Sequence, residues 1–116
     1  MLFRSKVQHT LLSEGCEIAG NVSESVLFSD VKVAKNANVE YSILMPGAVV
    51  EEGASVRYAI VASGAVIAKG AQVGEGPSDC DVDKWGVAVV AENVRIGENV
   101  KLAAKEMAGE DIPDAK

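Results

Sequence analysis

Two neighbouring stretches of the sequence are close copies of each other: YSILMPGAVVEEGASV begins at Tyr41, and YAIVASGAVIAKGAQV begins at Tyr58. The offset of 17 residues also relates segments 10–26, 27–43, 44–60 and 61–77, and the pattern resumes at residues 90–102. A fixed repeat of this length indicates one small structural unit that stacks on copies of itself. The sequence therefore predicts a solenoid.

Three apolar positions recur in each repeat at intervals of six, six and five residues. A helix would show intervals of three and four, and a strand buried on one face would show intervals of two. An interval of six instead favours a three-sided coil in which each side points one aliphatic side chain inward. The predicted inward columns are Thr10, Leu27, Leu44, Val61 and Val90; Cys16, Val33, Val50, Ile67 and Ile96; and Val22, Val39, Val56, Val73 and Leu102.

The residues between these columns agree with tight corners. Small residues are frequent there, and Asn36, Gly53, Gly70 and Asn93 are suited to a positive φ. Aromatic residues make up only 4% of the chain, so the core is expected to be narrow and aliphatic. The pattern resembles that of the left-handed parallel β-helix family, and the left hand is implied by this resemblance alone. We expect an all-β fold, a single left-handed parallel β-helix of hexapeptide repeats with about five coils and one inserted loop.

The repeat also suggests boundaries. We expect the β-helix at residues 6–107, with a loop insertion at residues 78–89. Residues 1–5 lack the repeat and are predicted to be a non-native leader. Residues 108–116 are expected to form a C-terminal tail that either caps the last coil or frays.

The predicted loop is acidic. Asp79, Asp81 and Asp83 alternate as in a calcium-binding loop, but the glycine and glutamate that such a loop requires do not follow. A solvated loop without a metal is therefore the expectation. Trp85 is expected to cover the seam between loop and coil.

Charge and cysteine content limit the function. The net charge of −6 argues against nucleic-acid binding and, more weakly, against anionic membrane surfaces. No apolar run approaches the roughly 20 residues that span a bilayer. Cys16 and Cys80 lie far apart without a CxxC motif, so we expect free thiols and a cytoplasmic location.

The residues that carry catalysis are scarce. His9 is the single histidine; it cannot supply a three-histidine zinc site and precedes the first convincing coil, so a solvated imidazole is expected. No serine or cysteine lies in a recognisable nucleophile motif, and no glycine-rich phosphate loop is present. No catalytic, cofactor-binding or metal-binding residue is predicted in this chain.

One outward position is apolar in successive repeats. We predict that the residues following the first inward column form an exposed stripe, which is a candidate interface: Leu11, Phe28, Met45, Ala62 and Ala91. The alternative is that the loop or the tail covers this stripe.

Several stretches resemble the C-terminal domain of bacterial glucose-1-phosphate adenylyltransferase (ADP-glucose pyrophosphorylase), namely LLSEGCEIAGNVSESVLFSDVKV, YSILMPGAVVEEGASV, YAIVASGAVI and WGVAVVAENVRIGENV. The resemblance runs from about Lys6 to Met107. It implies a protein of glycogen biosynthesis that makes ADP-glucose from ATP and glucose 1-phosphate. In that family an N-terminal nucleotidyltransferase domain carries out the reaction with Mg²⁺.

The motifs of that catalytic domain have no counterpart here, so no catalytic residue is carried over and the chain is predicted to be inactive alone. The family's β-helix packs on the catalytic domain, takes part in oligomer assembly and contributes to effector binding. The implied partners are therefore the N-terminal catalytic domain and further subunits, in a homo- or hetero-oligomer. ATP and Mg²⁺ are implied for the catalytic domain, and no cofactor for this chain.

Two other functions stay open. The chain is alternatively a free-standing hexapeptide-repeat acyltransferase that forms trimers, or a purely structural β-helix module. An acyltransferase of this kind needs a histidine in a mid-helix coil or loop, and the sequence has none there.

Overall fold

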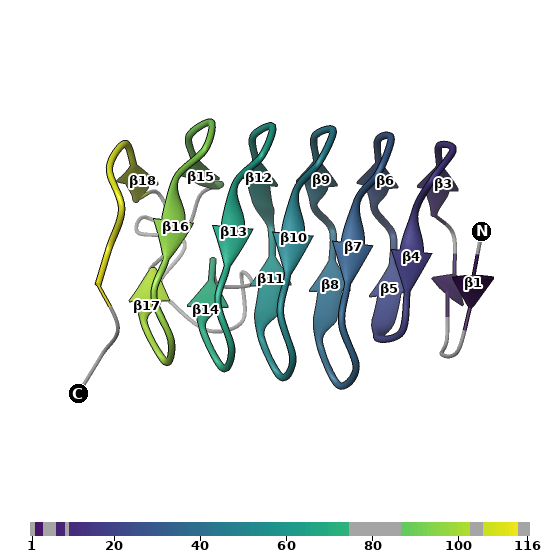
Figure 1. Ribbon diagram of the computed structural model, residues 1–116, viewed down its shortest axis with the longest axis horizontal. Coiled ribbons are helices and arrows are strands. Elements are labelled where there is room, and N and C mark those ends of the chain that lie inside the picture. Colours follow the sequence, from purple (N-terminus) through teal and green to yellow (C-terminus); the bar gives the residue numbers. More distant parts are fainter. Residues whose placement is uncertain (1, 4–6, 9, 75–86, 103–105, 114–116) are drawn as a thin grey trace.

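The protein is a solenoid whose coils stack along one axis (Figure 1), and its strands form three sheets. The computed structural model describes residues 2–3, 7–8, 10–74, 87–102 and 106–113. Its long axis extends over 37 Å. No described residue belongs to a helix long and apolar enough to cross a lipid bilayer.

Each side is a parallel sheet, with six strands among the described residues. Sheet A contains β1 (Leu2–Phe3), β4 (Glu17–Ile18), β7 (Lys32–Val33), β10 (Val49–Val50), β13 (Val66–Ile67) and β16 (Arg95–Ile96). Sheet B contains β2 (Val7–Gln8), β5 (Asn21–Ser23), β8 (Asn38–Glu40), β11 (Ser55–Arg57), β14 (Gln72–Val73) and β17 (Lys101–Leu102). Sheet C contains β3 (Leu11–Leu12), β6 (Val26–Leu27), β9 (Ile43–Leu44), β12 (Ala59–Val61), β15 (Ala88–Val90) and β18 (Met107–Ala108).

Over the central coils, each strand residue pairs with the residue 17 positions later, so the sequence repeat and the sheet register coincide. Val50 is the Cα partner of Val33 on one side and of Ile67 on the other, and all three side chains are buried. The columns that contain Val39 and Leu44 stack in the same way. The predicted all-β solenoid of about five stacked turns is confirmed, and its central turns bury one aliphatic side chain per side.

The corners confirm the predicted turn residues. Asn36, Gly53, Gly70 and Asn93 all have φ between 58° and 72°. This left-handed backbone lets the chain leave one sheet and enter the next within four residues, and Gly, Asn and Asp tolerate it best. The inward side of these corners is filled by small buried residues such as Ala54 and Ala71.

The first coil departs from the predicted alignment. Leu12 is the Cα partner of Leu27, and Ile18 is the Cα partner of Val33, each 15 residues later. Thr10 and Cys16 were therefore wrong assignments to those two columns. Thr10 is instead in register with the residue before β6. Cys16 is buried all the same, at a corner, where its thiol donates a hydrogen bond to the carbonyl oxygen of Phe28, 3.1 Å away.

A shortened corner explains the 15-residue step. Between β4 and β5 the chain has only Ala19 and Gly20, whereas the next coil uses four residues, 34–37. A Cβ atom on Gly20 would meet the backbone oxygens of both Ala37 and Ala34. Glycine is needed there because the two successive corners touch through their backbones.

The ladders extend past the predicted boundaries. β1 pairs with β4, so Leu2 and Phe3, which were placed in the leader, belong to sheet A. At the other end β18 pairs with β15, and Ile112 forms a parallel bridge with Ile96. Residues 108 and 112 of the predicted tail thus continue the coil, and residues 88–89 of the predicted loop already belong to β15.

Candidate interaction surface

The three outer faces differ in chemistry. On sheet B the outward column is polar: Asn21, Asn38, Ser55, Gln72 and Lys101. On sheet A it is mixed: Glu17, Lys32, Val49, Val66 and Arg95. On sheet C it is apolar in all six described strands: Leu11, Val26, Ile43, Ile60, Val89 and Met107. We call this last column the apolar face.

The apolar face is accessible to solvent. The side chains at its two ends are the most exposed, with Leu11 at 72% and Met107 at 70%, and Ile43 near the middle is 38% exposed. All the large apolar residues that are exposed in the described part of the chain lie on this face or beside it: Leu11, Phe28, Tyr41, Ile43, Val87 and Met107. Such a concentration on one side of a molecule is typical of a contact surface.

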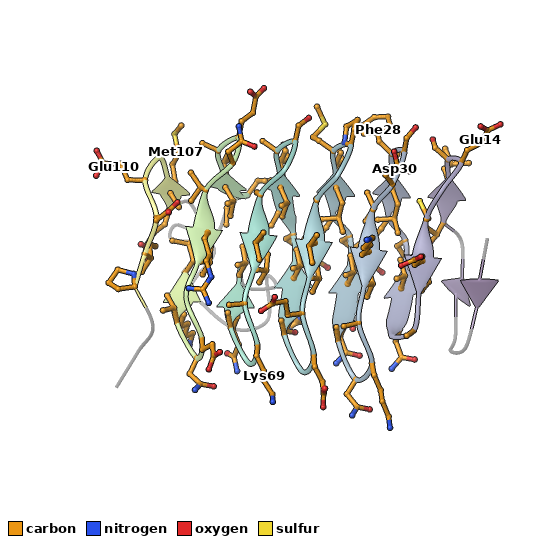
Figure 2. All side chains as sticks on the ribbon, viewed as in Figure 1. Glu14, Phe28, Asp30, Lys69, Met107 and Glu110 are labelled. Atoms are coloured by element: carbon orange, nitrogen blue, oxygen red, sulfur yellow. The ribbon has the colours of Figure 1, made fainter. Side chains whose placement is uncertain are left out.

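Four residues of the predicted stripe lie in one column along an edge of the apolar face. Phe28, Met45, Ala62 and Ala91 follow the inward residues of β6, β9, β12 and β15, and the amide of each bonds to a carbonyl of the next coil. We call these four residues the Phe28 border. Phe28 and Met107 project from the same side of the solenoid (Figure 2).

Leu11 is not part of that column. It is the Cα partner of Val26, so it lies on the apolar face itself, and Ser13 occupies the first position of the Phe28 border column. The shortened first coil shifted the alignment by two residues. The apolar face was not predicted, although the sequence carries a signal for it. Only in sheet C is the residue before the inward position apolar in every described strand.

The other edge of the apolar face carries an aromatic pair. The rings of Tyr41 and Tyr58 stack with centroids 4.8 Å apart and planes 11° apart. Both residues have a φ of 48°, because only four residues lie between the inward positions at this corner. Glu24 and Val87 occupy the same position in the flanking coils, and we call these four residues the Tyr41 border.

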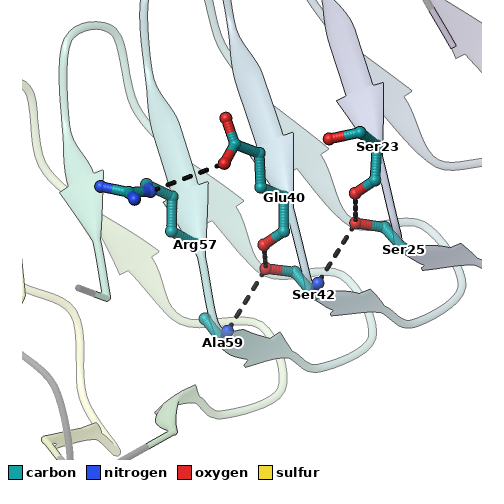
Figure 3. Close-up of polar contacts among 6 residues, drawn as sticks. All are labelled: Ser23, Ser25, Glu40, Ser42, Arg57 and Ala59. Atoms are coloured by element: carbon teal, nitrogen blue, oxygen red, sulfur yellow. Dashed lines mark hydrogen bonds and ion pairs between the residues drawn. The ribbon is translucent and has the colours of Figure 1, made fainter. Parts of the chain in front are cut away.

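A ladder of buried serines lies beneath this corner (Figure 3). The hydroxyl of Ser25 donates to the carbonyl of Ser23 at 2.7 Å and accepts from the amide of Ser42 at 3.2 Å. The hydroxyl of Ser42 donates to the carbonyl of Glu40 at 2.8 Å and accepts from the amide of Ala59 at 3.3 Å. The ladder satisfies backbone groups at a corner too tight for regular sheet pairing.

Next to the ladder, Arg57 and Glu40 form an ion pair on sheet B, with Nε and Oε2 3.9 Å apart (Figure 3). Both side chains are more than a third exposed, so water screens this contact. The pair adds little to stability.

Sheet A carries a shallow depression of about 570 Å³. Its walls include two lysines and four glutamates: Lys32, Lys69, Glu17, Glu51, Glu52 and Glu98. Carboxylates outnumber the ammonium groups, so this depression does not favour an anionic effector.

The described residues offer few side chains suited to catalysis or metal binding. Among the described residues, no three His, Cys, Asp or Glu side chains converge as metal ligands. His9, Cys80, Trp85 and the three loop aspartates lie outside the described residues.

The sequence matches a known family over most of its length. The family described as GlmU-like, C-terminal hexapeptide matches residues 3–88. The match supports a left-handed β-helix of hexapeptide repeats. It does not distinguish glucose-1-phosphate adenylyltransferase from other proteins that contain such repeats. No curated protein matches the chain.

Two solved structures are similar in outline. One is the acetyltransferase domain of PglB from Neisseria gonorrhoeae FA1090, with 18% identity, a TM-score of 0.39, and coverage of 90% of this chain and 48% of that chain. The other is WeeI from Acinetobacter baumannii AYE, with 14% identity, a TM-score of 0.28, and coverage of 92% and 50%. The chain spans about half the length of these proteins, and likenesses this weak carry no functional argument.

Proposed function

Because the chain belongs to the GlmU-like C-terminal hexapeptide family, we propose that it is an assembly domain, a rigid β-helix that joins protein subunits through sheet C. The observation that carries this proposal is the apolar face, which is continuous over all six described strands. Covering an exposed apolar surface of this extent with another surface lowers the free energy of the system.

We further propose that the parent protein is a bacterial glucose-1-phosphate adenylyltransferase. The support is the order of SEGCEI and SILMPGAVV in the sequence, which resembles the C-terminal domain of that family. In this proposal an N-terminal nucleotidyltransferase domain binds ATP, glucose 1-phosphate and Mg²⁺. The β-helix packs on that domain and holds the subunits of a cytoplasmic oligomer together.

The assignment is tested first on the gene. We expect the coding DNA upstream of Met1 to continue as an open frame that encodes a nucleotidyltransferase domain. The protein from the whole frame is expected to form ADP-glucose from ATP and glucose 1-phosphate with Mg²⁺, and residues 1–116 alone are expected to form none. Turnover by residues 1–116, or a stop codon directly upstream, would contradict the assignment.

The alternative of a hexapeptide-repeat acyltransferase predicts a different result. Such a protein would transfer an acyl group without any upstream domain and would form trimers. His9 is the one histidine available as a general base, so His9→Ala would abolish that transfer.

A further inference from the structure

We propose that two copies of this chain pack their apolar faces together, with the two solenoids antiparallel about a twofold axis that passes between β9 and β12. This proposal rests on the assembly role proposed above, and it names the partner and the geometry. In this arrangement the first strand of sheet C faces the sixth strand of the partner. The second likewise faces the fifth, and the third faces the fourth.

The apolar face is nearly the same in both directions. From one end it reads Leu11, Val26, Ile43, and from the other end it reads Met107, Val89, Ile60. The pairs that face each other are thus Leu with Met, Val with Val, and Ile with Ile. A twofold interface requires a surface that is complementary to its own reversed copy, and this column meets that requirement.

The Phe28 border is complementary to itself in the same geometry. A twofold axis along the strand direction places this border against the same border of the partner, in reversed order. Phe28 then faces Ala91 of the second copy, and Met45 faces Ala62. Each large side chain meets a small one, which allows close packing without voids or overlap.

The Tyr41 border also pairs without a clash of charge. Tyr41 faces Tyr58 of the second copy, so the stacked pairs of the two chains lie beside each other across the axis. Glu24 faces Val87 and not a second carboxylate. The described side chains of the apolar face are uncharged, so two chains of net charge −6 meet at the surface where repulsion is weakest.

The parallel arrangement fits less well. A twofold axis along the solenoid would place the Phe28 border against the Tyr41 border, coil against the same coil. Phe28 would then face Glu24 and Met45 would face Tyr41, in both cases a large side chain against another. The Phe28 border would lose the pairing of large with small side chains that the antiparallel arrangement provides, so the antiparallel arrangement is favoured.

The available area suits a weak dimer. Six strands about 4.8 Å apart make the face roughly 25–30 Å long. With a width near 20 Å, about 500–600 Å² per copy would be covered, or roughly 1,100 Å² in all, close to the lower limit for specific interfaces. A second copy therefore fits the whole face, and association is expected to require high protein concentration.

The mass of the chain in solution tests the dimer. At about 200 µM, chosen because small interfaces associate weakly, sedimentation equilibrium is expected to show twice the monomer mass of 12.1 kDa. Ile43→Glu, next to the proposed axis, is expected to raise the dissociation constant by at least about tenfold. Ser55→Glu, on the outer side of sheet B, is the matched control and is expected to leave it unchanged. A monomeric or trimeric wild-type chain, or equal loss in both variants, would overturn the proposal.

Cross-linking tests the direction of packing. In a Cys80→Ser background, chains with Leu11→Cys and chains with Met107→Cys are mixed and oxidised. The antiparallel dimer brings position 11 next to position 107 of the second copy and separates the two copies of position 11 by about 24 Å, far beyond disulfide reach. Mixed disulfides between the two variants are expected. Disulfides of each variant with itself, and none between them, would overturn the proposal.

These tests are independent of the assigned enzyme. A dimer of residues 1–116 with the mixed disulfide would stand even if the upstream frame encoded a different domain. Conversely, a monomeric chain would refute the dimer without affecting the assay for ADP-glucose. Circular dichroism of each variant verifies that the β-helix is folded.

Discussion

Val33 and Val50 are Cα partners on neighbouring strands of sheet A, and both side chains are excluded from solvent. Their contact is the repeating unit of the core, since each coil places one aliphatic side chain directly on the equivalent side chain of the coil before it. The hydrophobic free energy of the fold is therefore spread evenly along the axis.

A charge at one of these positions is expected to unfold the solenoid. Val50→Asp places a carboxylate between Val33 and Ile67 without a partner, and we expect a loss of about 4 kcal/mol or more in the free energy of unfolding. Val49→Asp, one residue earlier on the outer side of β10, is expected to cost much less. Urea denaturation followed by circular dichroism measures both, and a wild-type midpoint for Val50→Asp would refute the inward assignment.

Two glycine substitutions are expected to differ in cost. Gly53 has a φ of 71°, and an added methyl group would have open space around it, so Gly53→Ala meets only backbone strain, about 1 kcal/mol. Gly20→Ala adds a methyl group against two backbone oxygens of the next coil, which cannot move aside without opening that corner. We expect a larger drop in melting temperature for Gly20→Ala. Equal drops would show that the shortened corner does not constrain the first coil.

The serine ladder is expected to contribute to stability. Ser42→Ala removes the acceptor of the Ala59 amide and the donor to the Glu40 carbonyl, both at a buried corner. The expected cost is about 1–2 kcal/mol in the free energy of unfolding. Ser55→Ala, on the outer side of sheet B, serves as control with an expected cost near zero. Amide hydrogen exchange adds a local readout, because Ala59 should exchange faster only in Ser42→Ala.

The last coil is expected to depend on Asp111. Its Oδ1 accepts a hydrogen bond from the backbone amide of Arg95 at 2.8 Å, next to the bridge between Ile112 and Ile96. Asp111→Ala should speed hydrogen exchange at Arg95 and lower stability by about 1 kcal/mol. Glu110→Ala, at the exposed neighbouring position, is the control. Unchanged protection of Arg95 in Asp111→Ala would show that residues 109–113 do not close the solenoid.

Much of the fold was predictable because, over the central coils, the length of the sequence repeat equals the number of residues between paired strand positions. Residues 22–73 need only a shift of 17 to find their neighbours, so the columns of Val22, Val33 and Leu44 followed from the sequence. The corner residues were predictable for a local reason, since Gly53 and Asn36 are among the few residue types that accept a positive φ.

The candidate surface was predicted only in part. Phe28, Met45, Ala62 and Ala91 could be placed in one column from the sequence because they follow inward residues in regular coils. The apolar face was not found, because aliphatic residues directly before an inward aliphatic look like extra core residues when only the sequence is read. Inward core residues and outward surface residues are told apart only by the side of the strand to which each side chain points.

The architecture follows from the amino-acid order, because stacking coil on coil buries aliphatic residues that recur every 17 positions. The tertiary structure alone decided the register of the first coil and the chemistry of the three outer faces. The reason is that a two-residue deletion at a corner leaves the local pattern intact and is absorbed by backbone contact at Gly20. That shift moves Leu11 from the Phe28 border to the apolar face, where it completes the surface on which the proposed assembly depends.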